Sequence, residues 1–301
     1  MKYFIAFHGF CCIMKKIYGL FERMCYIMCK FIPKLIFFNG AELLEGPCWE
    51  AETESLYFVS IKADTVFRFN TKTGRIKSYA TDGAVGCAVL RDGKLITAEK
   101  SGIYERKIDD TEKQLIAHVY DDNIYRYNDG KLDPKGRLFV GTMGDGERQT
   151  GKCGLYRIDG ENEFTCVVSG TTISNGLGWT KDSSKMFFID TPTKEVWEFD
   201  YDLETGEISN KKVFTKIEDG APDGMCVDID DTLWIAHWGG SKVSHWDSRT
   251  GEYLGEIELP VSRVSCPVVG GKMMDTLYIT TALDPDGNEP LSGGLFAVKI
   301  R

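Results

Sequence analysis

The sequence lacks several patterns that would assign it directly to a functional class. Its 301 residues include ten cysteines but no Cys-x-x-Cys pair, so zinc-ribbon and thioredoxin-like centres are not expected. It contains no Gly-x-Ser-x-Gly sequence, which removes support for a nucleophile elbow and covalent serine catalysis. Only four histidines are present, and they do not cluster in the sequence; His237 is predicted to be a packed or rim residue.

A dense cluster of basic residues is also missing. The chain has 36 basic and 45 acidic residues and a net charge of −9, whereas a nucleic-acid partner favours a basic face. We therefore expect no nucleic-acid partner. The cysteines outside the first thirty residues are scattered, mostly within apolar strand-like runs, as free buried thiols in a reducing compartment would be. The predicted location is cytoplasmic.

The N-terminal segment, residues 1–33, differs in composition from everything that follows. Its apolar run, residues 4–14, is too short for a membrane-spanning helix, and charged residues from Lys15 onward interrupt every longer window. It also lacks a small-x-small cleavage site typical of signal peptides. An amphipathic helix on a membrane surface is one alternative. We interpret the segment as an extension outside the fold, with Met24 or Met28 as plausible true starts, and expect no integral membrane span.

A strand-like hexamer recurs six times in the remaining sequence. Successive copies are separated by roughly 39 to 48 residues, a spacing typical of propeller blades. Each copy is accompanied by further short strand-like runs and turn residues, and four short strands per repeat is the blade pattern. The copies begin at Ser55, Lys94, Arg137, Lys185, Thr232 and Thr276.

The two ends of this repeat region complement each other. The sixth repeat finishes with its third strand, residues 295–301, and an unassigned strand, residues 34–38, precedes the first repeat. A ring whose last blade takes its outer strand from the N-terminal side accounts for both and leaves no open sheet edge. The predicted fold is therefore an all-β, six-bladed β-propeller with four antiparallel strands per blade, formed as a single domain by residues 34–301.

Four repeats carry an oxygen-bearing side chain at one equivalent position, shortly before the hexamer. These residues are Glu45, Asn128, Asn175 and Asp223, and the other two repeats have Val85 and Cys266 there. In a propeller, equivalent positions at the start of the innermost strands gather at one end of the central channel. Oxygen ligands favour a hard divalent cation such as Ca²⁺, Mg²⁺ or Mn²⁺. The alternative is that each Asx-Gly pair simply forms a turn, which explains four positions in register less easily.

Two further side chains are candidates for contact with a ligand. Arg126 lies two residues before Asn128, so strand alternation turns both side chains the same way. It could clamp a hydroxyl or carboxylate group, or form a salt bridge at the rim. Glu147, within the polar segment 144–151, could overhang the pocket or be solvated.

The order of several motifs resembles one known family. They are Glu45-Gly46-Pro47-x-Trp49, Arg126-x-Asn128-Asp129-Gly130-x-x-Asp133-x-x-Gly136-Arg137, Gly141-Thr142-Met143, Ser174-Asn175-Gly176-Leu177-x-Trp179, Pro222-Asp223-Gly224 and Asp275-Thr276-Leu277-Tyr278. From about residue 42 to the C-terminus, the sequence is similar to the senescence-marker protein (regucalcin)/gluconolactonase/luciferin-regenerating-enzyme family. The resemblance implies a six-bladed propeller that binds a divalent metal on its axis and hydrolyses sugar lactones.

The resemblance also implies roles for individual residues. Glu45, Asn175 and Asp223 would bind one divalent cation, with Ca²⁺ first and Zn²⁺, Mn²⁺ or Mg²⁺ as alternatives. Arg126 and Asn128 would contact the substrate. The family's further substrate-binding acid lies in the loop after Gly-Thr-Met, which is short here, and Glu147 is the candidate for it.

The predicted function is metal-dependent opening of a sugar lactone, as in a gluconolactonase. The cation would polarise the lactone carbonyl, and Asp223 would act as the general base toward the attacking water. Two alternatives remain. The same site could act on another ester or a phosphotriester, or the chain could be a non-catalytic calcium-binding propeller.

Overall fold

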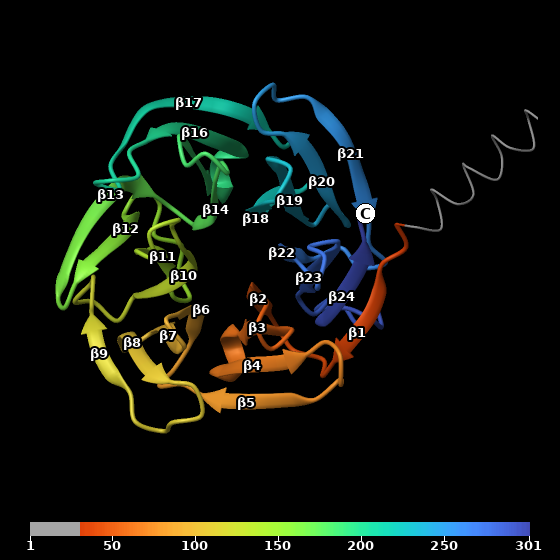
Figure 1. The fold of residues 1–301 in the computed structure, drawn as a ribbon, viewed down its shortest axis with the longest axis horizontal. Helices are drawn as coiled ribbons and strands as arrows, with labels where there is room; N and C mark the ends of the chain where they lie inside the picture. Colours follow the sequence, from red (N-terminus) through yellow and green to blue (C-terminus); the bar gives the residue numbers. More distant parts are fainter. Residues whose placement is uncertain (1–30) are drawn as a thin grey trace, which may run out of the picture.

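The computed structural model describes residues 31–301, in which six four-stranded antiparallel sheets are arranged as a ring (Figure 1). Blades 1 to 3 are β2 (Leu44–Glu50), β3 (Ser55–Ser60), β4 (Thr65–Asn70) and β5 (Ile76–Ala80); β6 (Val85–Arg91), β7 (Lys94–Glu99), β8 (Gly102–Lys107) and β9 (Gln114–Ala117); β10 (Tyr125–Leu132), β11 (Leu138–Gly144), β12 (Cys153–Gly160) and β13 (Glu163–Thr171). Blades 4 to 6 are β14 (Ser174–Trp179), β15 (Lys185–Asp190), β16 (Glu195–Tyr201) and β17 (Ile208–Lys216); β18 (Ala221–Val227), β19 (Thr232–Trp238), β20 (Lys242–Asp247) and β21 (Tyr253–Glu258); β22 (Val264–Gly270), β23 (Thr276–Thr281), β24 (Gly294–Lys299) and β1 (Lys34–Phe38). The predicted six-bladed propeller is confirmed.

Helical structure within the described part is limited to two 3-10 turns, η1 (Ile61–Ala63) and η2 (Thr191–Thr193). Neither this pair nor any other described segment forms an apolar helix long enough to cross a membrane. The interpretation of residues 1–33 as an extension falls almost entirely on residues outside the described part.

The ring closes as the sequence predicted. Strand β1, which precedes the first blade, pairs antiparallel with β24 in the last one, with Lys34 opposite Ala297 and Phe38 opposite Gly294. Figure 1 shows β1 lying along the outside of blade 6. Backbone hydrogen bonds between the two ends of the repeat region therefore complete the sixth sheet.

Burial changes systematically from the inside of each blade to the outside. The second strand is packed on both faces, and every residue of β3 is buried. The outermost strand meets solvent, and most of β17 is exposed. This gradient explains the near-continuous apolar runs of the repeated hexamer, because a strand covered on both faces does not alternate.

The hydrophobic core consists of clusters between neighbouring blades. Phe139 and Leu155 of blade 3, for example, pack with Leu177 and Phe188 of blade 4. Equivalent clusters join each of the remaining pairs of neighbouring blades around the ring. Because these clusters fill the spaces between blades, the axis of the ring can hold polar side chains.

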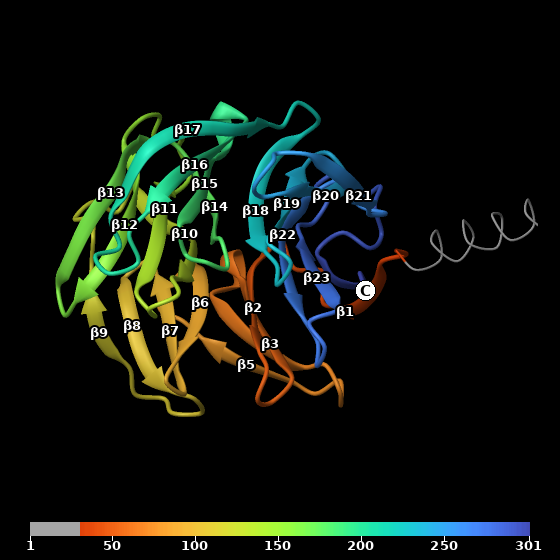
Figure 2. The same cartoon turned by 45° about the horizontal axis from the view of Figure 1, so that its top comes forward.

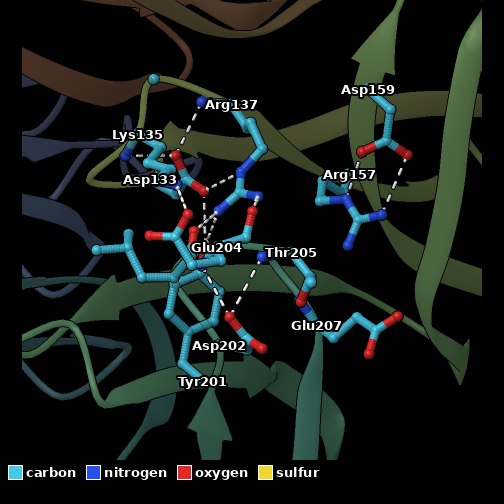
Figure 3. A network of polar contacts seen from close by, with 12 residues as sticks. Asp133, Lys135, Arg137, Arg157, Asp159, Tyr201, Asp202, Glu204, Thr205 and Glu207 are labelled. Carbon is cyan, nitrogen blue, oxygen red and sulfur yellow. Dashed lines mark hydrogen bonds and ion pairs between the residues drawn. The ribbon is translucent and has the colours of Figure 1, made fainter.

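A polar network joins blades 3 and 4 (Figure 3). Asp133, which is buried, accepts hydrogen bonds from Arg137 Nε at 2.6 Å and from Tyr201 Oη at 2.5 Å. Arg137 also donates to the carbonyl oxygen of Leu203 at 2.6 Å, and Lys135 pairs with Glu204. The motif residues Asp133 and Arg137 are therefore structural and lie apart from the axial positions.

The six cysteines of the described part are free thiols. Cys87, Cys153, Cys226 and Cys266 are buried, Cys48 is partly buried, and only Cys166 among them is exposed. This matches the expectation of mostly buried thiols. The cytoplasmic location remains a prediction.

Candidate metal and substrate site

The six equivalent positions lie within the first four residues of the six innermost strands. These strands, β2, β6, β10, β14, β18 and β22, surround the axis of the ring (Figure 2). Each has a shift in its pairing register at this point, between Glu45 and Cys48 in β2, for example, and between Pro222 and Met225 in β18. A bulge re-aims the side chains of its strand. Sixfold repetition of the bulge explains why these side chains gather at one end of the channel.

Three glycines that directly follow equivalent positions, Gly86, Gly176 and Gly224, let adjacent inner strands touch. A Cβ atom on Gly176 would lie 2.5 Å from the carbonyl oxygen of Asp223, and one on Gly224 would lie 2.3 Å from Cys266 Sγ. One on Gly86 would lie 2.4 Å from the carbonyl oxygen of Asn128. None of these three has a positive φ angle. The glycines are required by close approach of the backbones and not by turn formation.

Two of the candidate ligands, from neighbouring blades, are joined by a hydrogen bond. Asn175 Nδ2 donates to Asp223 Oδ1 and, at 3.0 Å, to Thr191 Oγ1. With both amide hydrogens used, Asn175 Oδ1 remains buried without a partner in the described part. Glu45 Oε2 accepts a hydrogen bond from the backbone N–H of Gly46 at 2.9 Å. The chain thus presents an unpaired amide oxygen beside two carboxylates.

The electrostatics of this group favour a bound cation. Burial raises the pKa of Glu45 well above its usual value, and the charges of Asp223 and Asp129 raise it further. Burial, followed by the charge of Asp129, likewise raises the pKa of Asp223. Ionised carboxylates this deeply buried repel one another, and a divalent cation would relieve that repulsion.

The donor set consists of carboxylates and amides. Among residues 31–301, no three Asp, Glu, His or Cys side chains gather closely enough to hold a metal by themselves. Any ion held here would therefore depend on amide oxygens such as that of Asn175. This oxygen-only set suits Ca²⁺ or Mg²⁺.

Arg126 and Asn128 lie side by side, as strand alternation predicted. Arg126 Nη1 donates to Asn128 Oδ1 at 2.9 Å and to the carbonyl oxygen of Tyr127 at 2.8 Å, while Asn128 Nδ2 donates to Ser174 O at 3.0 Å. Arg126 is 6% exposed, and burial lowers its pKa. Within the described part, it forms no ion pair, and its Nε and Nη2 atoms have no hydrogen-bond acceptor. A rim salt bridge, the alternative for this residue, is thus absent from the described part.

Asp145 is an acid close enough to Arg126 to interact with it, in addition to Glu45 and Asp223. Asp145 pairs with Lys100 at 2.5 Å, and the positive charges of Lys100 and Arg126 lower its pKa. Glu147, in the connection between β11 and β12, has an exposed side chain and forms no hydrogen bond with another described side chain. Its predicted role in substrate binding remains a prediction. Sequence reasoning overlooked Asp145, although it directly follows β11.

His237 forms its hydrogen bonds with residues other than the candidate ligands. His237 Nδ1 is 2.7 Å from the carbonyl oxygen of Asp219, and its Nε2 is 2.8 Å from Ser244 Oγ. It is 4% exposed and packed, as expected.

Asp129 is a second residue that sequence reasoning missed. It is 3% exposed, its Oδ1 accepts from Gly130 N at 2.8 Å, and its Oδ2 has no partner within residues 31–301. The signal for it is its place in the Asn128-Asp129-Gly130 motif. The adjacent bulge places its charge close enough to raise the pKa values of both Glu45 and Asp223.

Comparison with known proteins identifies the family. A family model described as the SMP-30/Gluconolactonase/LRE-like region matches residues 43–283. Regucalcin from Danio rerio is 36% identical over 247 residues, covering 80% of this chain and 83% of that protein. The putative sugar lactone lactonase YvrE of Bacillus subtilis is 33% identical over 270 residues, covering 85% and 90%.

The crystal structure of a calcium-binding protein, regucalcin, from Agrobacterium tumefaciens is also similar. It has a TM-score of 0.84 and 25% sequence identity, covering 90% of this chain and 94% of that one. The chain belongs to the SMP-30/gluconolactonase/LRE-like family.

Proposed function

We propose that this protein is a divalent-metal-dependent hydrolase that opens sugar lactones. The observation that carries the proposal is the convergence of Glu45, Asn175 and Asp223 on one end of the channel, beside a buried arginine with free donors. The family membership and the name of the B. subtilis relative support a lactone as substrate.

The side chains of the site fit a cation. Asn175 Oδ1 is a buried acceptor without a partner in the described part, and burial and the neighbouring acids raise the pKa values of Glu45 and Asp223 despite the positive charge of Arg126. Glu45, Asn175 and Asp223 would hold the ion, Ca²⁺ first and Zn²⁺, Mn²⁺ or Mg²⁺ as alternatives. When bound, it would supply the positive charge that polarises a lactone carbonyl.

The remaining groups would bind and orient the substrate. Arg126 Nε and Nη2 would donate to hydroxyl oxygens of the sugar ring. Asn128 would contact the same ligand from a side chain already fixed by Arg126 and Ser174. Because both side chains are locked before the ligand arrives, little conformational entropy is lost on binding. Glu147 remains the proposed further contact to the substrate, and Asp145 is the alternative acid for this role.

Asp223 is the proposed general base. Asn175 donates to its Oδ1, which holds the carboxylate in one orientation, and no residue of the described part donates to Oδ2. Oδ2 would accept the proton of the water that attacks the lactone carbonyl. Opening of the ring would then give the hydroxy acid.

The test is a lactone assay after chelation and add-back of each metal. Wild-type protein should lose turnover of gluconolactone with a chelator and regain it with one or more of the four ions. Asp223→Asn and Glu45→Gln should abolish turnover, whereas Asp228→Asn, which changes another buried acid just after β18, should retain it. Full activity in either site variant would refute the scheme.

Assays with the same protein and metals also distinguish two other functions. Turnover of phosphotriesters or simple esters, but not of lactones, would assign the site a different substrate. Metal binding without turnover of any of them would indicate a calcium-binding propeller, a function suggested by the description of the A. tumefaciens protein. The free donors of Arg126 favour a substrate.

A further inference from the structure

A chamber separate from the proposed metal site is lined by later parts of the inner strands. Its volume is about 350 Å³, within the range of roughly 300–1,000 Å³ usual for small-molecule sites. Its lining comes from β2, β6, β10 and β22 and from Met274, just beyond β22. None of Glu45, Arg126, Asn175 and Asp223 lines it, so it is distinct from the proposed lactone site.

Three polar groups of the lining have unused hydrogen-bonding capacity. Asp129 Oδ2 and Trp49 Nε1 are buried and lack a partner within residues 31–301. Lys131 Nζ donates to the carbonyl oxygens of Leu177, at 3.1 Å, and Met225, which leaves one of its three N–H groups free. The three residues that carry these groups, Asp129, Trp49 and Lys131, all line the chamber, and buried polar groups of this kind are normally paired.

The rest of the lining is apolar and firmly held. Leu90, Leu132, Val268 and Met274 supply the walls. The ring of Trp49 is stacked on Tyr278, with 5.5 Å between centroids and 15° between planes. A chamber with apolar walls and a few fixed polar atoms matches the general character of ligand sites.

The charges in the lining indicate a neutral ligand. An acid, Asp129, and a base, Lys131, both line the chamber and can offset each other's charge. A charged ligand would add an uncompensated charge to a buried environment, which is unfavourable. A hydroxyl group both donates and accepts, so it can satisfy Asp129 Oδ2 and one of the two donors at once.

We propose that this chamber is a second small-molecule site, for a neutral ligand with a compact apolar body and one hydroxyl group. The hydroxyl donates to Asp129 Oδ2 and accepts from Lys131 Nζ or Trp49 Nε1, and the apolar body packs against Leu132 and Val268. Gly46 and Asp129 also directly follow Glu45 and Asn128, so an occupant touches the backbone of the neighbouring site. The proposal does not depend on lactone hydrolysis.

The test uses 4-fluorophenol as probe and fluorobenzene, which lacks the hydroxyl, as its matched control. Binding to the full chain is followed by ¹⁹F NMR, and the site is located by nuclear Overhauser contacts from the probe to methyl groups of Leu132, Val268 and Met274. We expect saturable binding of 4-fluorophenol and about three- to tenfold weaker binding of fluorobenzene, the factor that one hydrogen bond typically supplies.

Two variants complete the design. Trp49→Phe removes the Nε1 donor but keeps an aromatic ring against Tyr278, and it should weaken 4-fluorophenol binding by about three- to tenfold. Val268→Phe fills the chamber and should abolish binding, with a thermal unfolding curve as the check that it folds. Absence of saturable binding to wild-type protein, equal affinity for both probes, or contacts that map elsewhere would each overturn the proposal.

Discussion

Replacement of Gly176 by alanine should damage both stability and metal binding, because this glycine sits where two inner strands meet. The new Cβ would lie 2.5 Å from the carbonyl oxygen of Asp223 and 2.8 Å from the backbone nitrogen of Met225. Ordinary contacts of a Cβ atom are 3.4–4 Å, and both obstructing atoms belong to the backbone, so β18 must move by nearly an ångström. Overpacking of this kind costs about 1–3 kcal/mol.

The matched control is Gly178→Ala, two residues further along the same strand. There the close contact is the Cγ2 atom of Val227, at 2.9 Å, which side-chain rotation can relieve. Urea unfolding in the presence of a chelator measures the free energy of unfolding of each variant, and calorimetric titration with Ca²⁺ measures affinity. Gly176→Ala should lose more unfolding free energy and more Ca²⁺ affinity than Gly178→Ala, because the displaced strand carries Asp223. Equal stability of the two variants would refute the reasoning.

Three further predictions concern charge and metal. In the presence of a chelator, Glu45→Gln should be more stable than wild type at pH 8 and should lose this advantage near pH 4. The pKa of Glu45 is higher in the folded than in the unfolded protein. Protonation of Glu45 therefore stabilises the fold fully below the unfolded-state pKa, and this contribution is lost as the pH rises through the folded-state pKa. A less stable Glu45→Gln in urea unfolding at pH 8 would contradict this. Saturating Ca²⁺ should raise the melting temperature of wild type but not of Glu45→Gln, as scanning calorimetry would show. Arg301→Ala should cost about 1.5–3 kcal/mol in urea unfolding, because Arg301 bonds to Asp228 and Met274 at 2.6 Å; Arg157→Ala should cost less, because its partner Asp159 is 28% exposed whereas Asp228 is 2% exposed.

The fold could be predicted because a propeller repeats its signal. One apolar hexamer such as Lys185–Asp190 is ambiguous, but six at blade spacing are not, and the unpaired segment 34–38 indicated the closure. The spacing also placed Glu45, Asn175 and Asp223 at equivalent positions. Periodicity therefore determined which residues share one end of the channel.

What the sequence did not reveal depends on local backbone geometry. The bulge in each inner strand changes the alternation of side chains, so Asp129 lies in the channel although it follows Asn128 directly. The pairing of Asp145 with Lys100 joins two blades and leaves no pattern within either. The role of Gly176 was likewise invisible, because close approach of two strands and a turn both favour glycine.

Closure of the ring through β1 has a consequence for the order of folding events. Its partner β24 is the last strand of the repeat region, so the sixth sheet cannot be completed before nearly all of the chain is available. Phe37 of β1 also packs against Phe58 and Phe67 of blade 1, at 5.6 and 5.4 Å between ring centroids. One short strand thus joins the first blade to the last through contacts of maximal sequence separation, which form slowly. Docking of β1 is expected to be a late step, and its release would expose the edge of β24 to pairing with another chain.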